Sequence, residues 1–294
     1  GLPNAGSAAS RHKGRLAAAL ALTLAYMAAE VVGGLLTGSL ALLADAAHML
    51  TDAGGLALAL LAIRFGERAA TPLKTFGYLR FEILAALVNA VVLLLLTIYI
   101  LFEAYQRFVS PPPVLGWPML LVAAVGLGVN LISMRLLAGG SSESLNVQGA
   151  YFEVLSDMLG SLGVIIAALI IMATGWTLAD PLIGAGIGLF IVPRTWRLLS
   201  QAVHILLEGT PAHIDVAKLS RELASLPGVQ RVYDLHVWTV TSGFDAMSAH
   251  VVVEDLGTAP GVIRSVRALM QDRFRIEHVT IQVEDEALAR EAPE

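Results

Sequence analysis

Long apolar segments separated by short polar connections fill the first two thirds of the chain. A helix needs about 20 mostly apolar residues to cross a bilayer. Six segments meet this requirement, near residues 16–36, 40–65, 78–105, 117–137, 146–172 and 181–199. Glycine- and proline-containing turns separate them, including Thr37-Gly38-Ser39 and the three prolines at 111–113. This pattern predicts an all-α membrane domain of six transmembrane helices.

Basic residues gather at alternate connections between these segments. They precede the first segment, surround the second connection and end the sixth segment, as Arg11, Lys13, Arg15, Arg64, Arg68, Lys74, Arg80, Arg194 and Arg197. The first and fifth connections contain no Lys or Arg. Because positive charge favours the cytoplasmic side, the pattern predicts that both termini are cytoplasmic, in agreement with six spans.

A different pattern begins after Glu208. Helical spacing covers residues 216–225 and 260–274, and strand-like alternation covers 229–240, 247–254 and 278–284. The order αββαβ predicts a small α+β domain with its helices on one sheet face. We therefore divide the chain into a leader without a signal-peptide pattern (1–15), a membrane domain (16–207), a cytoplasmic domain (208–288) and a tail (289–294).

The alternation in these strands places three histidines opposite the main apolar residues. His236, His250 and His278 are expected on a sheet face free of helices, with Glu284 as a further candidate ligand. This face is interpreted as a dimer interface, a metal site or both. A domain of about 80 residues is small for independent stability, which favours a partner surface.

The composition supports a membrane protein. Hydrophobic residues make up 56% and charged residues 15% of the chain, and the mean hydropathy is +0.72, whereas soluble domains have about 25% charged residues. The absence of cysteine excludes disulfides and thiolate metal ligands.

Two polar patches interrupt the apolar segments. His48 and Asp52 lie four residues apart, as do Glu153 and Asp157, so each pair shares one helix face. A charge inside the bilayer costs at least roughly 2.5–3.5 kcal/mol, and binding a divalent cation between the two helices would offset that cost. The alternative is a hydrogen-bonded clamp between helices, which contributes only about 0.6–2 kcal/mol. Asp45 is interpreted as a residue at the outer mouth of the site or as a helix cap.

Other polar residues in the spans have two interpretations. Glu30, Asn89, Asn130 and Asn146 are expected to form helix–helix hydrogen bonds or to line a pathway. Arg80 and Glu208 flank the membrane segments and are predicted to form an ion pair that ties the membrane domain to the cytoplasmic domain.

Five sequence stretches resemble the cation diffusion facilitator family, and specifically its bacterial zinc-transporter branch. They cover residues 38–52, 82–89, 234–238, 248–251 and 278–282. The resemblance implies a homodimer with a metallochaperone-like cytoplasmic domain, located in a bacterial inner membrane. It also implies export of Zn²⁺ in exchange for protons, with the two four-apart pairs as the transport site.

Glu153 departs from the family pattern, because the zinc branch usually has His there. A site of one His and three carboxylates also suits Mn²⁺, Co²⁺ or Cd²⁺, so a transporter of broader selectivity is the alternative. Lys74 stands where relatives usually have His, which argues against a metal site in that loop.

Competition between protons and metal for this carboxylate-rich site predicts antiport, since ligands must lose protons to bind metal. No cofactor is expected beyond the transported ion and, if the histidine face binds metal, a regulatory Zn²⁺ in the cytoplasmic domain, and nucleic acid is not expected as a partner. An intramembrane zinc hydrolase is disfavoured, because no His-Glu-x-x-His pattern occurs. A membrane metal sensor remains the alternative from another class.

Overall fold

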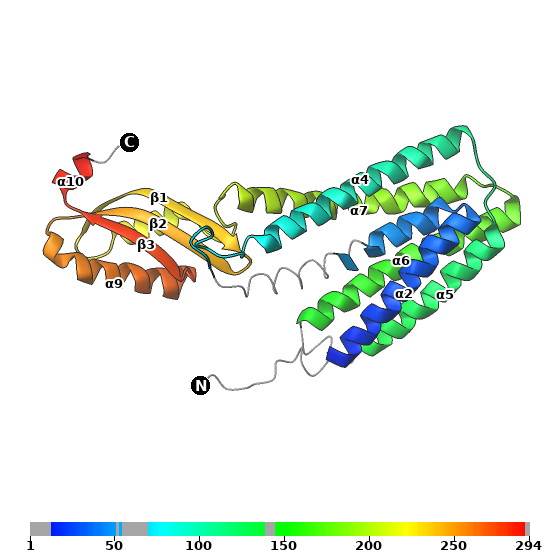
Figure 1. The fold of residues 1–294 in the computed structure, drawn as a ribbon, viewed down its shortest axis with the longest axis horizontal. Coiled ribbons are helices and arrows are strands. Elements are labelled where there is room, and N and C mark those ends of the chain that lie inside the picture. The colour runs from blue at the N-terminus through cyan, green and yellow to red at the C-terminus, as the bar shows by residue number, and fades with distance from the viewer. Residues whose placement is uncertain (1–12, 51–52, 55–69, 139–144, 292–294) are drawn as a thin grey trace. The chain divides into compact units, whose positions relative to one another are not determined.

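The computed structural model describes residues 13–50, 53–54, 70–138 and 145–291, and for 13–20, 136–138 and 145–153 it describes the backbone alone. The chain divides into two compact units (Figure 1). One contains residues 1–58 and 88–198, and the other contains residues 59–87 and 199–294.

The first unit is helical. Its elements are α2 (Lys13–Thr37), an unlabelled helix over Leu40–Leu50, α4 (Phe81–Val109), α5 (Gly116–Ala138), α6 (Leu145–Thr174) and α7 (Ala179–Leu206), of which α4 and α7 extend beyond it. Helix α5 packs against both α2 and α6. The core contains many small side chains, namely those of Ala41, Ala123, Ala167, Ala168 and Ala179. Small residues let helix backbones approach closely, as in membrane bundles.

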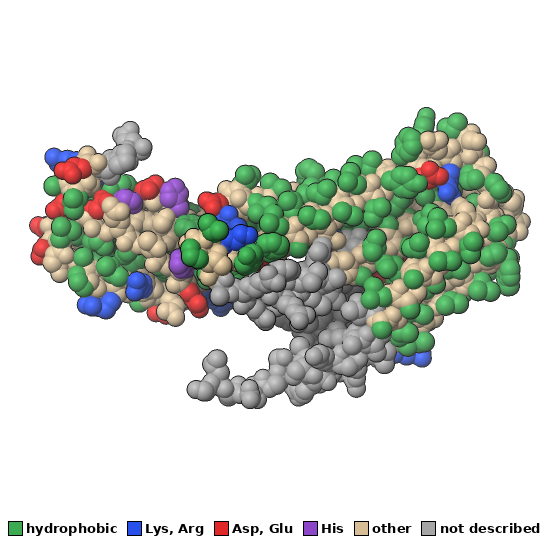
Figure 2. Space-filling model, viewed as in Figure 1, with side chains coloured by type: hydrophobic (Ala, Val, Ile, Leu, Met, Phe, Trp, Pro, Cys, Tyr) green, Lys and Arg blue, Asp and Glu red, His purple; other side chains and the backbone are tan. Residues whose placement is uncertain are grey.

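Four of the described helices are long and apolar enough to cross a bilayer. They cover Phe81–Val109, Gly116–Arg135, Val154–Thr174 and Ala179–Leu206, whereas the apolar stretches Ala21–Thr37 and Leu40–Leu50 are shorter. Many large apolar side chains point outward, among them Leu95, Phe102, Leu121 and Phe190, and Figure 2 shows hydrophobic side chains over the visible helices. Such a surface suits lipid rather than water. The predicted helical membrane domain is confirmed.

The second unit contains a three-stranded sheet flanked by helices. Its elements are α8 (Val216–Ala224), β1 (Val229–Thr241), β2 (Phe244–Val253), the 3₁₀ turn η1 (Leu256–Thr258), α9 (Ala259–Leu269), the π-turn η2 (Met270–Phe274), β3 (His278–Glu284) and α10 (Glu286–Glu291). The predicted α+β domain is confirmed.

The sheet order is β1-β2-β3. Strands β1 and β2 are antiparallel and joined by a tight turn, in which Gly243 has the positive φ of +75° that favours glycine. Strands β2 and β3 are parallel, so α9 supplies the crossover between them. Leu219 and Leu223 of α8 and Val262 and Val266 of α9 share one core with the sheet. Both helices therefore cover the same sheet face.

Candidate metal centre

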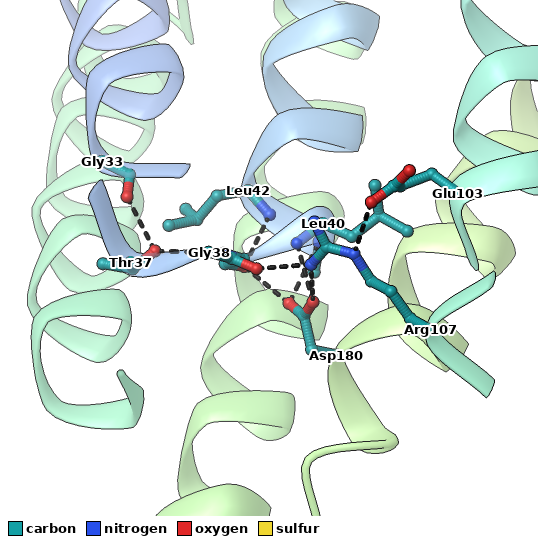
Figure 3. A network of polar contacts seen from close by, with 10 residues as sticks. Gly33, Thr37, Gly38, Leu40, Leu42, Glu103, Arg107 and Asp180 are labelled. Atoms are coloured by element: carbon teal, nitrogen blue, oxygen red, sulfur yellow. Dashed lines mark hydrogen bonds and ion pairs between the residues drawn. The ribbon is translucent and has the colours of Figure 1, made fainter. Parts of the chain in front are cut away.

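Asp180, in the first turn of α7, caps the helix that begins at Leu40 (Figure 3). Its carboxylate accepts hydrogen bonds from the backbone N–H groups of Leu40 at 2.7 Å and Ala41 at 3.1 Å, and from the Ser39 hydroxyl at 2.6 Å. The Ser39 oxygen in turn accepts from the N–H of Leu42 at 3.1 Å. The first N–H groups of a helix have no partner within it. A distant side chain thus fixes where the helix carrying Asp45 and His48 begins.

Arg107 of α4 balances the charge of this cap. Its guanidinium lies 3.4 Å from the Asp180 carboxylate, donates to Glu103 at 3.1 Å, and donates to the carbonyl of Gly38. Gly38 has φ of +71°, in the left-handed region that favours glycine. The Asp180 side chain is fully buried, and a buried carboxylate of this kind needs a cationic partner. The contacts join three helices at the end of the bundle where the Leu40 helix begins.

His48 and Asp157 face each other between the Leu40 helix and α6. The imidazole Nε2 lies 3.7 Å from Asp157 Oδ1, and the two residues are 6% and 3% exposed. His48 belongs to the predicted pair His48/Asp52, and Asp157 belongs to the predicted pair Glu153/Asp157. Asp52 lies outside the described residues, and so does the side chain of Glu153. Within the described part of the chain, no three His, Asp or Glu side chains are grouped as ligands for a metal ion.

A second buried polar layer contains side chains of four helices. The Tyr26 hydroxyl donates to Glu30 Oε1 at 2.5 Å within α2. The Asn130 amide of α5 donates to Ser161 of α6, whose hydroxyl donates to Asp45 Oδ2, each at 3.4 Å. Glu30, Asp45, Asn130 and Ser161 are all 0% exposed. Asp45 thus bonds to a neighbouring helix, and Asn130 makes a helix–helix hydrogen bond of the predicted kind.

The cytoplasmic unit holds a second group of histidines and carboxylates. His236 Nε2 lies 2.8 Å from Asp234 Oδ1, and His250 Nδ1 lies 3.0 Å from Glu284 Oε1. His250 Nε2 also lies 3.8 Å from Asp234 Oδ2. Asp234 has φ of +49° at a register shift in β1, which is typical of a bulge that redirects a side chain. The bulge brings Asp234 between the two histidines.

Glu284 is the most enclosed member of this group, at 2% exposure. It accepts hydrogen bonds from the Tyr233 hydroxyl at 2.5 Å and from the Gln282 amide at 2.5 Å. The bond from Tyr233, followed by those from Gln282 and His250, holds the pKa of Glu284 below its usual range despite its burial. The same carboxylate raises the pKa of Tyr233.

His278 does not join the other two histidines. The strand register pairs it with Ala246, four residues along β2 from His250, a separation of about 13 Å at 3.3 Å per residue. Its ring instead lies 5.6 Å from that of Phe76 and 5.9 Å from that of Phe244. The alternation of side chains along each strand predicted that all three histidines lie on one sheet face. Alternation does not specify how far along the strands each histidine lies.

Arg80 and Glu208 form an ion pair at 2.9 Å, with side chains 37% and 62% exposed. Ion pairs at such exposure contribute about 0–1 kcal/mol. The ion pair predicted from the sequence is therefore present, and its expected contribution to the free energy of unfolding is small.

Two family models match the chain. The cation efflux transmembrane domain matches residues 16–207, and the cation efflux protein cytoplasmic domain matches residues 211–286.

The chain belongs to the cation efflux family.

Bacterial members of the family are similar over most of their length. The chain is 51% identical over 268 residues to the metal cation efflux system protein CzcD of Cupriavidus metallidurans, covering 90% of this chain and 84% of CzcD. It is 46% identical over 272 residues to the zinc transporter ZitB of Escherichia coli, covering 92% and 87%. It is 43% identical over 267 residues to the cadmium, cobalt and zinc/H⁺-K⁺ antiporter of Bacillus subtilis, covering 89% and 86%. The expected cation diffusion facilitator family is confirmed, and this cation efflux protein is a membrane transporter and not an enzyme.

Asp180 and Arg107 were not singled out from the sequence of this cation efflux protein. The signal was available, because each is a charged residue next to or within an apolar span, where ionisable groups usually have a specific role. The helix cap that Asp180 forms could not be predicted from the sequence, since Ser39 and Asp180 lie 141 positions apart.

Proposed function

We propose that this cation efflux protein exports Zn²⁺ from the cytoplasm in exchange for protons, using His48, Asp52, Glu153 and Asp157 as the transport site. The observation that carries the proposal is the buried approach of His48 to Asp157 across two helices. Imidazole nitrogen and carboxylate oxygen are both zinc ligands, at about 2.0–2.2 Å. The names of the relatives CzcD, ZitB and the Bacillus antiporter support the same activity.

The coupling follows from the chemistry of this ligand set. A site of three carboxylates and one imidazole is unfavourable when it is empty and fully ionised, because like charges repel in a poorly solvated interior. Protonation relieves this repulsion, and so does Zn²⁺, which displaces the protons when it binds. If the site opens alternately to each side of the membrane, the competition for one site becomes antiport.

The proposed arrangement in the membrane has six spans with both termini in the cytoplasm of a bacterium, across the inner membrane. The basic residues at alternate connections support this orientation. Two copies are proposed to assemble through the domain matched at residues 211–286. That domain is small enough that an additional partner surface would add to its stability.

We also propose that His236, His250 and Glu284 bind a regulatory Zn²⁺ in the cytoplasmic domain. Nitrogen and oxygen donors of this kind suit zinc, and Asp234 already links the two histidines. In the described arrangement the groups form hydrogen-bonded pairs, so binding requires these side chains to turn toward a common centre. His278 is left out of the site because of its register position.

The test is a flux measurement on the full-length protein in liposomes that contain a zinc indicator and a pH indicator. Addition of Zn²⁺ outside should produce zinc entry together with proton exit, both absent from protein-free liposomes. Zinc entry without a pH change would contradict antiport. If zinc binds without crossing the membrane, the protein is a membrane metal sensor.

A further inference from the structure

We propose that Glu30 and Asp45, here called the carboxyl pair, share one proton and form a proton-binding site separate from the four proposed metal ligands. This proton is passed to the metal site when the cation leaves, and it is then replaced from water. The inference rests on the proposed antiport, because the pair supplies one of the exchanged protons.

The carboxyl pair is fully enclosed. Both residues are 0% exposed, and their carboxyl groups lie within hydrogen-bonding reach of each other. Glu30 Oε2 and Asp45 Oδ1 have no hydrogen-bond donor among the described residues. Two ionised carboxylates in that position would repel without compensation. One proton held between them supplies the missing donor to both oxygens.

Two neighbouring glycines leave space for this arrangement. A Cβ at Gly160 of α6 would overlap Asp45 Oδ1, the oxygen without a donor. A Cβ at Gly126 of α5 would overlap the Tyr26 hydroxyl, which donates to Glu30. Gly128 of α5 and Gly163 of α6 are different, since a Cβ at Gly128 would meet nothing within 4 Å and one at Gly163 only Ile183 at 3.4 Å. The space left by Gly160 and Gly126 is therefore filled by the Asp45 carboxyl and by the hydroxyl bound to Glu30.

The position of the carboxyl pair suits proton transfer. Asp45 precedes His48 by three residues, and Ser161 follows Asp157 by four, so the Asp45–Ser161 layer lies one helical turn from the His48–Asp157 layer. Chains of Asp, Glu and His inside membranes are typical of proton relays. When the proton leaves Asp45 for the imidazole, the pair is left with two negative charges, which favours rapid reprotonation.

Several titratable or charged groups surround the carboxyl pair. Tyr26 lies on α2 beside it, His48 follows Asp45 on the same helix, and Asp157 of α6 interacts with Glu30 through its charge. Helix α5 contributes the uncharged Asn130, and Arg194 of α7 acts on His48. The described surroundings thus supply no cation in contact with the pair.

The first experiment measures protonation directly, by infrared spectroscopy of the zinc-loaded, full-length protein in lipid, so that the proposed metal ligands carry no protons. A protonated carboxylic acid has a carbonyl stretch that a carboxylate lacks. We expect this band at neutral pH in the wild type, and we expect its loss in both Glu30→Gln and Asp45→Asn. Glu254→Gln, at an exposed residue, is the matched control and should keep it. Absence of the band from the wild type, or its survival in both variants, would overturn the inference.

The second experiment measures zinc and proton flux in liposomes. Glu30→Gln should leave the zinc Kd within about threefold, while it slows zinc-driven proton exit by at least about tenfold, or 1.4 kcal/mol in the barrier. Gly160→Ala, which keeps both carboxyls but displaces Asp45, should slow proton exit in the same way, and Gly163→Ala should not. Equal rates in the two glycine variants would contradict the proposed role.

The outcomes also separate this inference from the proposed function. If the wild type carries no zinc but shows the acid band, antiport fails while the protonated pair remains. If the wild type exchanges zinc for protons and the Glu30→Gln variant does so at the same rate, the relay fails alone. If the flux defect of the variants is a lost dependence on K⁺ rather than on pH, the pair binds an alkali cation and the inference is overturned.

Discussion

The two histidine–carboxylate pairs of this protein have similar chemistry in opposite surroundings. His48 and Asp157 lie 3.7 Å apart with side chains 8% and 4% exposed, whereas His236 and Asp234 lie 2.8 Å apart with side chains 64% and 55% exposed. In water such a pair is solvated and contributes little. Inside an apolar bundle the same groups are costly unless a cation or proton accompanies them. Burial, rather than proximity, is therefore the stronger indication of function.

Two of the aspartates that cap helices provide a parallel comparison. Asp180 caps the Leu40 helix from another helix and is 0% exposed. Asp215 caps α8 within its own chain segment, is exposed, and accepts from the N–H of Lys218 at 3.0 Å. The first cap organises the membrane site, and the second only starts a surface helix.

The largest expected effect comes from making the same change in both pairs. Asp157→Asn removes a proposed metal ligand and should lower the initial rate of zinc uptake into liposomes more than about 100-fold, beyond the usual effect of outer-shell groups. Asp234→Asn should lower it less than about tenfold, since its group is hydrated. Equal losses in the two variants would contradict the comparison.

The second effect concerns the caps. Asp180→Ala leaves Arg107 without its buried partner and should reduce the free energy of unfolding by about 3–5 kcal/mol. Asp215→Ala should cost about 0.5–2 kcal/mol, the usual loss for an N-cap. Unfolding midpoints of the two variants in the same detergent measure the difference. A smaller loss at Asp180 than at Asp215 would argue against the role of the buried cap.

The third effect concerns selectivity in the membrane site. Glu153→His replaces a hard oxygen ligand by an imidazole and should shift the preference toward Zn²⁺ over Mn²⁺ by about tenfold, or 1.4 kcal/mol. Competition between the two ions in the flux measurement gives this ratio. Glu277→His, at an exposed position of the cytoplasmic unit, is the control. An unchanged ratio in the Glu153 variant would remove this residue from the selectivity argument.

The smallest effect is expected in the cytoplasmic domain. Because the pKa of Glu284 is lowered in the folded state, its interactions stabilise the protein above the ordinary glutamate pKa, and this contribution is lost as pH falls through the lower folded value. Tyr233→Phe removes the main cause of the shift. It should lower the unfolding midpoint slightly at neutral pH and progressively less as the solution is acidified. A decrease that grows on acidification would contradict this assignment.

The sequence was sufficient for features that depend on local periodicity. Spacing predicted the three strands and the approach of the helix faces that carry His48 and Asp157. Contacts between distant segments were not predictable in this way. The bulge at Asp234 breaks the two-residue repeat, and the position of His278 depends on strand register.

The membrane interior shows the same limit. Single polar residues in apolar segments, such as Glu30 and Asp45, could be identified from the sequence. Their environment depends on residues of other helices, since the Tyr26 hydroxyl lies where a Cβ at Gly126 would be and Asp45 lies where one at Gly160 would be. A glycine in the sequence indicates available space but does not identify the side chain that fills it.

The most direct test of the central claim is X-ray absorption at the zinc edge of the full-length protein. His236 and His250 are replaced by Ala for this measurement, so that bound zinc reports on the membrane site. We predict a first shell of one nitrogen and three oxygens at about 2.0–2.2 Å, which is lost in the Asp157→Asn variant. A shell of oxygens alone, or one with two or more imidazoles, would contradict it.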